Sequence, residues 1–123
     1  LNTAPNGLVC ASPDYYLARN VDRIPLSAKL FAHDSHCMVN LKSKTMSVVE
    51  RDTGRRIVVD IADFPYTLIW STPQEPMRFI CIEPWHSIPS EDNGPIEWEK
   101  KPCAASLAPN EMWQTTLNMT FER

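Results

Sequence analysis

Eleven prolines are spread along the 123 residues of this chain, and they restrict the regular structure that it can form. Proline fixes its own φ angle and lacks a backbone N–H, so it breaks helix interiors and is confined to the edges and ends of sheets. Only three glycines accompany these prolines. The sequence therefore predicts many short extended segments and argues against long helices.

Composition excludes several classes of partner. The chain is 43% hydrophobic and 22% charged, which suffices for one small domain with its own core. Its net charge of −3 provides no basic surface, so we expect no nucleic-acid partner. No apolar run approaches the roughly 18 residues that span a bilayer, so we expect no membrane partner. The chain starts at Leu1 without a signal-peptide pattern, and we expect it to be a piece of a longer polypeptide.

Four cysteines are widely spaced, without a CxxC pair among them: Cys10, Cys37, Cys81 and Cys103. Cys37 and Cys81 lie in apolar segments, where a free buried thiol is the common explanation. This placement favours reduced thiols and a cytoplasmic location. The alternative is a small secreted domain held by two disulfides, for which three pairings are possible.

The clearest local structure is a β-hairpin at residues 45–61. Its two arms alternate or are rich in Val and Ile, and Gly54 between them can adopt a positive φ. Further strands are predicted at residues 7–11, 37–41, 66–71, 77–83 and 111–122, and one helical turn at residues 27–31. Short strands at this spacing, without a convincing helix, predict an all-β antiparallel protein, either a β-sandwich or part of one.

One carboxylate stands out at the end of a predicted buried strand. An apolar run at residues 79–82 leads directly to Glu83, and Pro84 and Trp85 follow. Because Pro84 cannot donate to a ladder, we expect the strand to end or bulge there. Alternation places Glu83 on the face of Cys81, where a carboxylate beside a tryptophan fits a pocket that handles protons or hydroxyls. The alternative is a solvated glutamate at a strand end.

A long loop broken by prolines is predicted at residues 87–102. Loops of this length are uncommon in compact domains and are usually functional or disordered. Because the loop begins beside Glu83, it can form a rim of a site there. Its acidic content also fits a solvated excursion, and the sequence leaves both interpretations open.

Three motifs in fixed order carry a resemblance to a known family: FPYTLIWS at residues 64–71, FICIEPW at residues 79–85 and LAPNE at residues 107–111. This succession resembles the C-terminal part of the aldose 1-epimerases (galactose mutarotases), in particular their LacX-like branch. The resemblance covers residues 25–123, and CIEPW following FPYxxIW is more specific than either motif alone. The chain departs from the family pattern at His86-Ser87, where an aromatic residue and a glycine are usual, and at Asn110, where glycine is usual.

The resemblance implies a large antiparallel β-sandwich of the supersandwich type. Whole members of the family are much longer than this chain. Residues 1–123 would then form the C-terminal portion, roughly half, of a single galactose mutarotase-like domain.

The resemblance also implies a reaction, the interconversion of the α and β anomers of a free hexose. A base removes the proton of the anomeric hydroxyl, an acid protonates the ring oxygen, and the ring opens and recloses. In this family the base is the glutamate that matches Glu83, and neither a metal nor an organic cofactor is needed. The acid is a histidine upstream of the matched region, so we expect the isolated chain to be inactive.

Further site residues follow from the same comparison and from position. Asp34 best matches a substrate-binding aspartate of the family, although a turn carboxylate is the alternative. The indole of Trp85 can pack on a sugar ring or in the core. His86, beside Glu83 and Trp85, is a third substrate-binding candidate, although a surface or structural role is the alternative for it, as for His33 and His36.

Two expectations complete the interpretation. Half of a sandwich exposes apolar faces and unpaired edges, so we expect pairing with a missing N-terminal half or self-association. The alternative function is a non-catalytic carbohydrate-binding or structural β-sandwich, in which Glu83 is buried or ion-paired and no histidine approaches it. The sequence leaves open which sugar is bound and whether a phosphorylated sugar is preferred.

Overall fold

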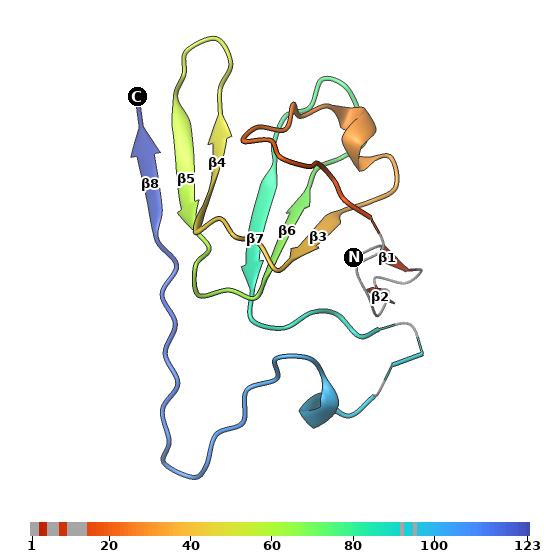
Figure 1. The fold of residues 1–123 in the computed structure, drawn as a ribbon, viewed down its shortest axis with the longest axis vertical. Coiled ribbons are helices and arrows are strands. Elements are labelled where there is room, and N and C mark those ends of the chain that lie inside the picture. Colours follow the sequence, from red (N-terminus) through yellow and green to blue (C-terminus); the bar gives the residue numbers. More distant parts are fainter. Residues whose placement is uncertain (1–2, 5–7, 10–14, 92, 95) are drawn as a thin grey trace.

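The computed structural model describes residues 3–4, 8–9, 15–91, 93–94 and 96–123, and this part of the chain is all-β (Figure 1). Two antiparallel three-stranded sheets account for most of the regular structure, an arrangement consistent with the predicted β-sandwich. The described elements are β1 (Thr3–Ala4), β2 (Leu8–Val9), η2 (Ala28–Phe31), β3 (His36–Val39), β4 (Thr45–Val49), β5 (Arg56–Asp60), β6 (Tyr66–Trp70), β7 (Cys81–Trp85), η3 (Trp98–Lys100) and β8 (Met119–Glu122).

The predicted hairpin is present as β4 and β5. The backbone N–H of Glu50 donates to the carbonyl of Arg55 at 2.8 Å, and the N–H of Gly54 donates to the carbonyl of Glu50 at 2.9 Å. Gly54 adopts a φ of 74°, as the turn chemistry predicted. The side chains of Thr53 and, to a smaller extent, Arg55 donate hydrogen bonds to the Glu50 carboxylate, and these bonds lower the pKa of Glu50 from its ordinary value.

β6 is the central strand of the first sheet, whose order is β3-β6-β7. Leu68 of β6 lies between Cys37 of β3 and Glu83 of β7. Leu68 on one face is 6% exposed and Thr67 on the other is 1% exposed, so β6 is covered on both sides. The side of Leu68 carries the hydrophobic cluster formed by Val9, Cys37, Leu68 and Ile88, against which Val39, Tyr66, Trp70 and Trp85 pack.

The expected break at Pro84 is wrong, because β7 continues through this residue to Trp85. Pro84 lies opposite Thr67, in register with the rest of the pair. β7 is an edge strand, and β6 is its strand partner among the described residues. A proline at a sheet edge can direct its nitrogen away from the partner strand, so it removes no ladder hydrogen bond.

The second sheet, of order β4-β5-β8, is amphipathic. The register aligns two apolar rows on one face, Met46–Val59–Met119 and Val48–Ile57–Phe121. The other face carries polar side chains, including the ion pair of Arg56 with Glu122. Val59 is 4% exposed but Phe121 is 72% exposed. Ile57, in the row of Phe121, is 40% exposed, so the apolar face is covered at Val59 and open along the row of Ile57 and Phe121.

The last predicted strand is much shorter than expected. Residues 111–122 alternate, but only Met119–Glu122 form β8 (Figure 1). The N–H of Asp60, the last residue of β5, donates to the carbonyl of Asn118 at 3.0 Å, so β5 ends where the longer strand would need a partner. The alternating pattern predicted an extended backbone for residues 111–122. The strand is shorter because β5 provides no partner beyond Asp60. The preceding turn contains Asn110 at a φ of 67°, as expected for a substitute for glycine.

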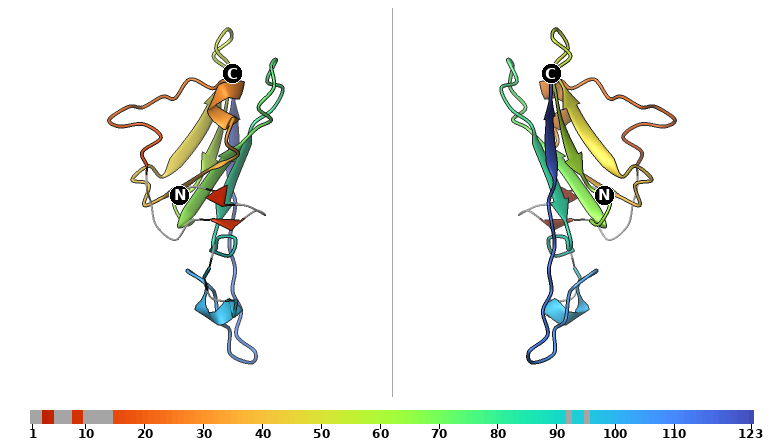
Figure 2. Two further views of the ribbon diagram at one scale, coloured as in Figure 1. Left: turned by 90° about the vertical axis from the view of Figure 1, so that its right-hand side faces the viewer. Right: turned by 90° about the vertical axis from the view of Figure 1, so that its left-hand side faces the viewer.

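The remaining segments surround the first sheet. The predicted helical turn is a 3₁₀ helix, η2, and of the strand predicted at residues 7–11 the structure describes Leu8–Val9, the rest lying outside the described residues. The N–H of Val9 donates to the carbonyl of Ser90 at 3.1 Å, which joins the N-terminal segment to the loop after β7. Figure 2 shows η3 and the segment after it below the two sheets. None of the helices in the described part of the chain is long and apolar enough to cross a membrane.

We predict that Gly54→Ala lowers the free energy of unfolding by about 1 kcal/mol, because alanine is strained at a positive φ. An added Cβ would meet nothing within 4 Å, so the loss would come from the backbone and not from a clash. Gly54→Asn should lose less, since asparagine tolerates this conformation better. Urea unfolding followed by circular dichroism measures both changes, and an alanine variant as stable as the parent would contradict the prediction.

Candidate functional site

Glu83 lies at the middle of β7, on the edge of the first sheet. Its side chain shares a face with Leu68 opposite it and with Cys81 and Trp85 on its own strand. The residue is half-buried, and its carboxylate makes no hydrogen bond or ion pair with the described residues. A carboxylate in this state can accept a proton or a hydrogen bond from a ligand.

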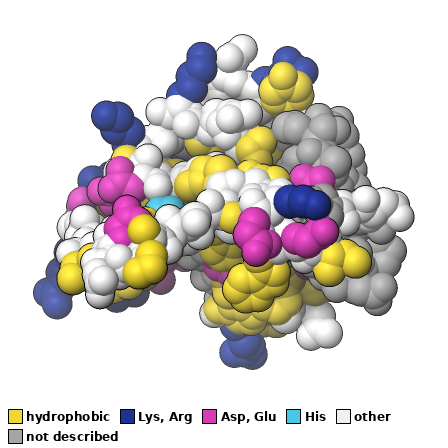
Figure 3. Space-filling model, turned by 90° about the horizontal axis from the view of Figure 1, so that it is seen from below, with side chains coloured by type: hydrophobic (Ala, Val, Ile, Leu, Met, Phe, Trp, Pro, Cys, Tyr) yellow, Lys and Arg dark blue, Asp and Glu magenta, His cyan; other side chains and the backbone are white. Residues whose placement is uncertain are grey.

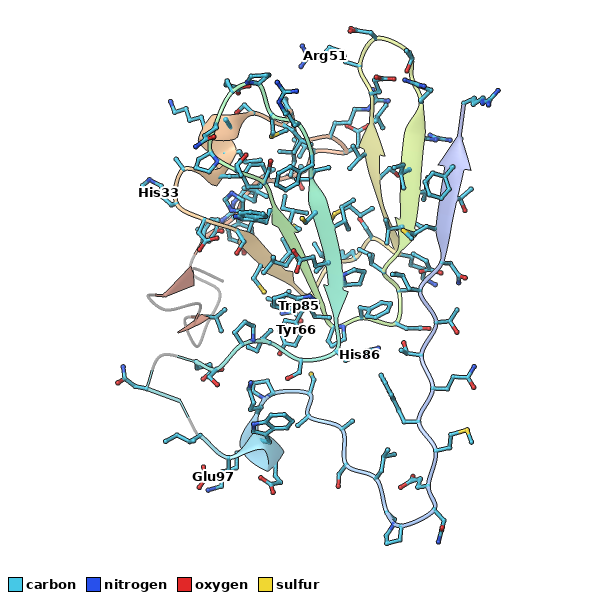
Figure 4. The ribbon with its side chains drawn as sticks, turned by 180° about the vertical axis from the view of Figure 1, so that it is seen from behind. His33, Arg51, Tyr66, Trp85, His86 and Glu97 are labelled. Atoms are coloured by element: carbon cyan, nitrogen blue, oxygen red, sulfur yellow. The ribbon has the colours of Figure 1, made fainter. Side chains whose placement is uncertain are left out.

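Trp85 lies at the end of the same strand, directly opposite Tyr66 of β6. Figure 4 shows the two side chains next to one another at the lower end of the sheet. Trp85 is half-buried and packs against the hydrophobic cluster. Since Glu83 and Trp85 are two positions apart on one strand, they lie about 7 Å apart along it. The structure therefore brings these two predicted site residues together.

Asp34 occupies the turn between η2 and β3. It has a φ of 80°, its N–H donates to the carbonyl of Phe31 at 3.1 Å, and its Oδ1 accepts from the N–H of Ser35 at 2.7 Å. The following strand, β3, lies two strand spacings, about 10 Å, from Glu83 on β7. The exposed Asp34 is thus a turn carboxylate that the fold keeps apart from Glu83, and its role in substrate binding stays a prediction.

His86 follows β7 and contacts the extended segment before β8. Its Nε2 lies 2.9 Å from the Oγ1 of Thr115, and its ring centroid lies 4.8 Å from that of Trp113 and 4.6 Å from that of Phe64. Figure 4 shows His86 beyond Trp85 at the lower end of β7. These contacts fasten the extended segment to the first sheet, and they are the observed role of this side chain.

His36 has a structural environment on β3. It lies opposite Ile69, so its side chain projects from the face opposite to that of Leu68 and Glu83. Its Nε2 lies 2.7 Å from the carbonyl oxygen of Leu30, which can only accept, so this nitrogen carries a proton. Its Nδ1 lies 2.7 Å from the hydroxyl of Tyr15. Both ring nitrogens are therefore occupied by protein contacts.

A hollow of about 620 Å³ lies next to Trp85 at the lower end of the molecule. It is lined by Trp85, Ile88, Trp98, Glu99, Lys101 and Ser106, among others. The long loop after β7 thus forms much of the wall of this hollow, whereas the expected rim was for a site at Glu83. Figure 3 views this end and shows exposed hydrophobic side chains among acidic and basic ones.

Glu83 does not line this hollow, nor a second one of about 520 Å³ that Tyr15, Tyr16 and residues 36–41 border. The carboxylate and the Trp85 hollow are therefore neighbours on one face but separate features. Among the described residues, no group of three His, Cys, Asp or Glu side chains is placed to hold a metal ion.

Tyr66 is a site feature that the sequence did not point to. Burial is the main cause that raises the pKa of Tyr66 to about 12, and a hydrogen bond from the Cys103 thiol at 4.0 Å is the second cause. The motif FPYTLIW contains this tyrosine, but only the strand register places it opposite Trp85. The sequence signal that could have pointed to Tyr66 was its position in FPYTLIW, the motif that precedes the strand of Glu83.

Three cysteines of the described part of the chain are in no disulfide: Cys37, Cys81 and Cys103. Cys37 is 2% exposed in the core, and burial raises the pKa of its thiol. Such a thiol is chemically inert. Cys10 lies outside the described residues.

We predict that Tyr66 ionises well above the ordinary pH range of a tyrosine. Its native pKa of about 12 exceeds the ordinary value of 10.0, so the folded state holds the phenolic proton more tightly than the unfolded state. This contribution to stability is present below pH 10 and is lost as the pH rises to about 12. Ultraviolet absorbance titration should show a late phenol step that disappears in Tyr66→Phe, and a step that persists in that variant would refute the assignment.

Comparison with known proteins gives one relationship. No protein-family model and no solved structure matches the chain. Over 103 residues, 83% of the chain, it is 30% identical to the plasmid and chromosomal forms of protein LacX from Lactococcus lactis subsp. lactis. The match covers 34% of each of these proteins, so the chain spans about a third of their length. The chain is thus similar to LacX proteins over most of its own residues.

Proposed function

We propose that this sequence is part of an aldose 1-epimerase-like isomerase that interconverts the anomers of a free hexose. The observation that carries the proposal is the placement of Glu83, a half-buried carboxylate without a partner among the described residues, on the same sheet face as Trp85. The two motifs that resemble the epimerases form the neighbouring strands β6 and β7. The similarity to LacX proteins supports the same branch of the family.

In the proposed reaction Glu83 accepts the proton of the anomeric hydroxyl. The ring C–O bond to the anomeric carbon then breaks as an acid protonates the ring oxygen, and a carbonyl forms at the anomeric carbon. Rotation about the adjacent C–C bond and reclosure give the other anomer, with each proton returned. His36 and His86 are engaged elsewhere in the described structure, and the family resemblance assigns the acid to a histidine upstream of the matched region.

The activity therefore belongs to a longer polypeptide of LacX length that contains this sequence. In this proposal, Asp34 and His86 contact sugar hydroxyls where further residues of the longer polypeptide extend the binding site to them. A cytoplasmic setting accompanies it, since the described cysteines, including buried Cys37, are thiols.

A non-catalytic carbohydrate-binding module is the second candidate. The observation that favours it is that Glu83 lines neither hollow, since small molecules usually bind in concave pockets. This candidate predicts sugar binding by the chain without anomer exchange in any longer polypeptide.

The deciding experiment is anomer exchange on glucose and galactose, measured by NMR. In the longer polypeptide, Glu83→Gln should slow exchange at least about 100-fold, the ordinary loss when a general base is removed. Glu97→Gln is the matched control, because Glu97 is an exposed carboxylate whose ion pair with Lys100 contributes little. The isolated chain should be inactive. Exchange that survives Glu83→Gln would overturn the assignment of the base.

We also propose that the isolated chain self-associates through the open apolar face at β8. Met119 and Phe121 are 54% and 72% exposed on that face, and the outer edge of β8 is unpaired among the described residues. A free edge beside exposed apolar rows is a ready site for strand addition. In a polypeptide of LacX length, additional strands would cover the same face.

Light scattering after size-exclusion chromatography tests this association. The chain should form concentration-dependent dimers or larger species, and Phe121→Ser should shift them toward monomer. Tyr16→Ser is the control, since Tyr16 is 70% exposed but lies outside the sheets. A chain that stays monomeric at all concentrations would contradict the proposal.

A further inference from the structure

The hollow beside Trp85 has the walls of a small-molecule site. Its volume of about 620 Å³ falls within the range of roughly 300–1,000 Å³ that ligand pockets occupy. Two indole side chains border it, Trp85 from the end of β7 and Trp98 from η3. Trp98 is 81% exposed, so a ligand that covers its ring would remove a large apolar surface from water.

Local hydrogen bonds hold the wall of the hollow in shape. The hydroxyl of Ser87 donates to the carbonyl of Pro102 at 3.0 Å, which joins the start of the loop to its end. The N–H of Lys101 donates to the carbonyl of Trp98 at 3.1 Å, and the N–H of Ala104 donates to that of Lys101 at 3.2 Å. These bonds close the turn that carries Trp98, so the indole stands on a defined backbone.

Two charged groups on the wall have free hydrogen-bonding capacity. Glu99 and Lys101 both line the hollow, and neither side chain makes a hydrogen bond or ion pair with the described residues. Their neighbours Glu97 and Lys100 pair with one another instead, at 3.2 Å. Glu99 can therefore accept, and Lys101 can donate, hydrogen bonds to a bound molecule.

These features select the chemistry of the ligand. The indoles favour a ring with an apolar face, and the polar wall favours groups on its edge that both donate and accept. One carboxylate and one ammonium group cancel in charge, so the hollow favours neither an anion nor a cation. We propose that the hollow between Trp85 and Trp98 binds a neutral pyranose, with the ring on the indoles and its hydroxyls on Glu99 and Lys101.

This site is separate from Glu83 and does not depend on the proposed isomerase reaction. A methyl β-pyranoside tests it, because a methylated anomeric oxygen prevents ring opening and leaves binding as the only event. The 123-residue chain has four tryptophans, so each indole N–H gives a separate signal in a proton–nitrogen correlation spectrum. Titration with methyl β-galactoside and methyl β-glucoside should shift the signals of Trp85 and Trp98 and leave those of Trp70 and Trp113 in place.

Variants locate the binding. Trp98→Ala should weaken it about tenfold, as expected for the loss of one stacking face, while Trp98→Phe should restore part of it. Trp113→Ala is the matched control, because Trp113 is a 49% exposed indole outside the lining of the hollow. Glu83→Gln should bind as the parent does. The same spectra report whether each variant is folded.

Each other outcome overturns the proposal. If neither glycoside shifts the two indole signals, the hollow is not a pyranose site. If adenosine shifts them and the glycosides do not, the ligand is a flat aromatic ring and the proposed class is wrong. If Glu83→Gln abolishes binding and Trp98→Ala does not, the sugar sits at Glu83. Failure of the isomerase proposal alone would leave glycoside binding unchanged.

Discussion

Burial of β6 on both of its faces sets the arrangement of the first sheet and of the segments packed on it. Thr67 on one side and Leu68 on the other are almost fully buried, so neither face can turn to solvent. A strand in this position needs partners along both edges to satisfy its backbone groups, and β3 and β7 provide them. Because a shift of one residue would exchange the faces, this burial also fixes the register of both neighbours.

The register then determines on which face of the sheet each candidate functional residue lies. It places Glu83 beside Leu68 and Trp85 beside Tyr66, on the face of the hydrophobic cluster. It sends His36 to the opposite face, where both of its ring nitrogens contact protein groups. A carboxylate next to aromatic rings therefore arises from strand pairing alone, without any loop having to position it.

The second sheet and the lower end of the molecule contain the surfaces that the chain itself leaves open. The apolar face of the second sheet is covered at Val59 and exposed at Ile57 and Phe121. The extended segment before β8 gains its contacts with the first sheet from His86. The hollow at Trp98 differs from that face. Hydrogen bonds within its own turn shape its wall, and the Glu99 and Lys101 side chains on the wall can bond to a ligand. The open apolar face at β8 is suited to the addition of a strand, and the hollow at Trp98 is suited to a small ring-shaped ligand.

Local elements could be predicted from the sequence, because hydrophobic alternation and turn residues act over a few positions. The sequence predicted the hairpin with Gly54, the all-β class and the proximity of Glu83 to Trp85. The predictions for Pro84 and for the length of the last strand were wrong, because both depend on where a strand lies in its sheet. An edge strand tolerates proline, and a strand ends where its neighbour ends. The position of Tyr66 opposite Trp85 follows from the pairing of β6 with β7, and the hollow at Trp98 follows from the way residues 85–106 fold back on the end of β7. Neither could be predicted from local sequence patterns.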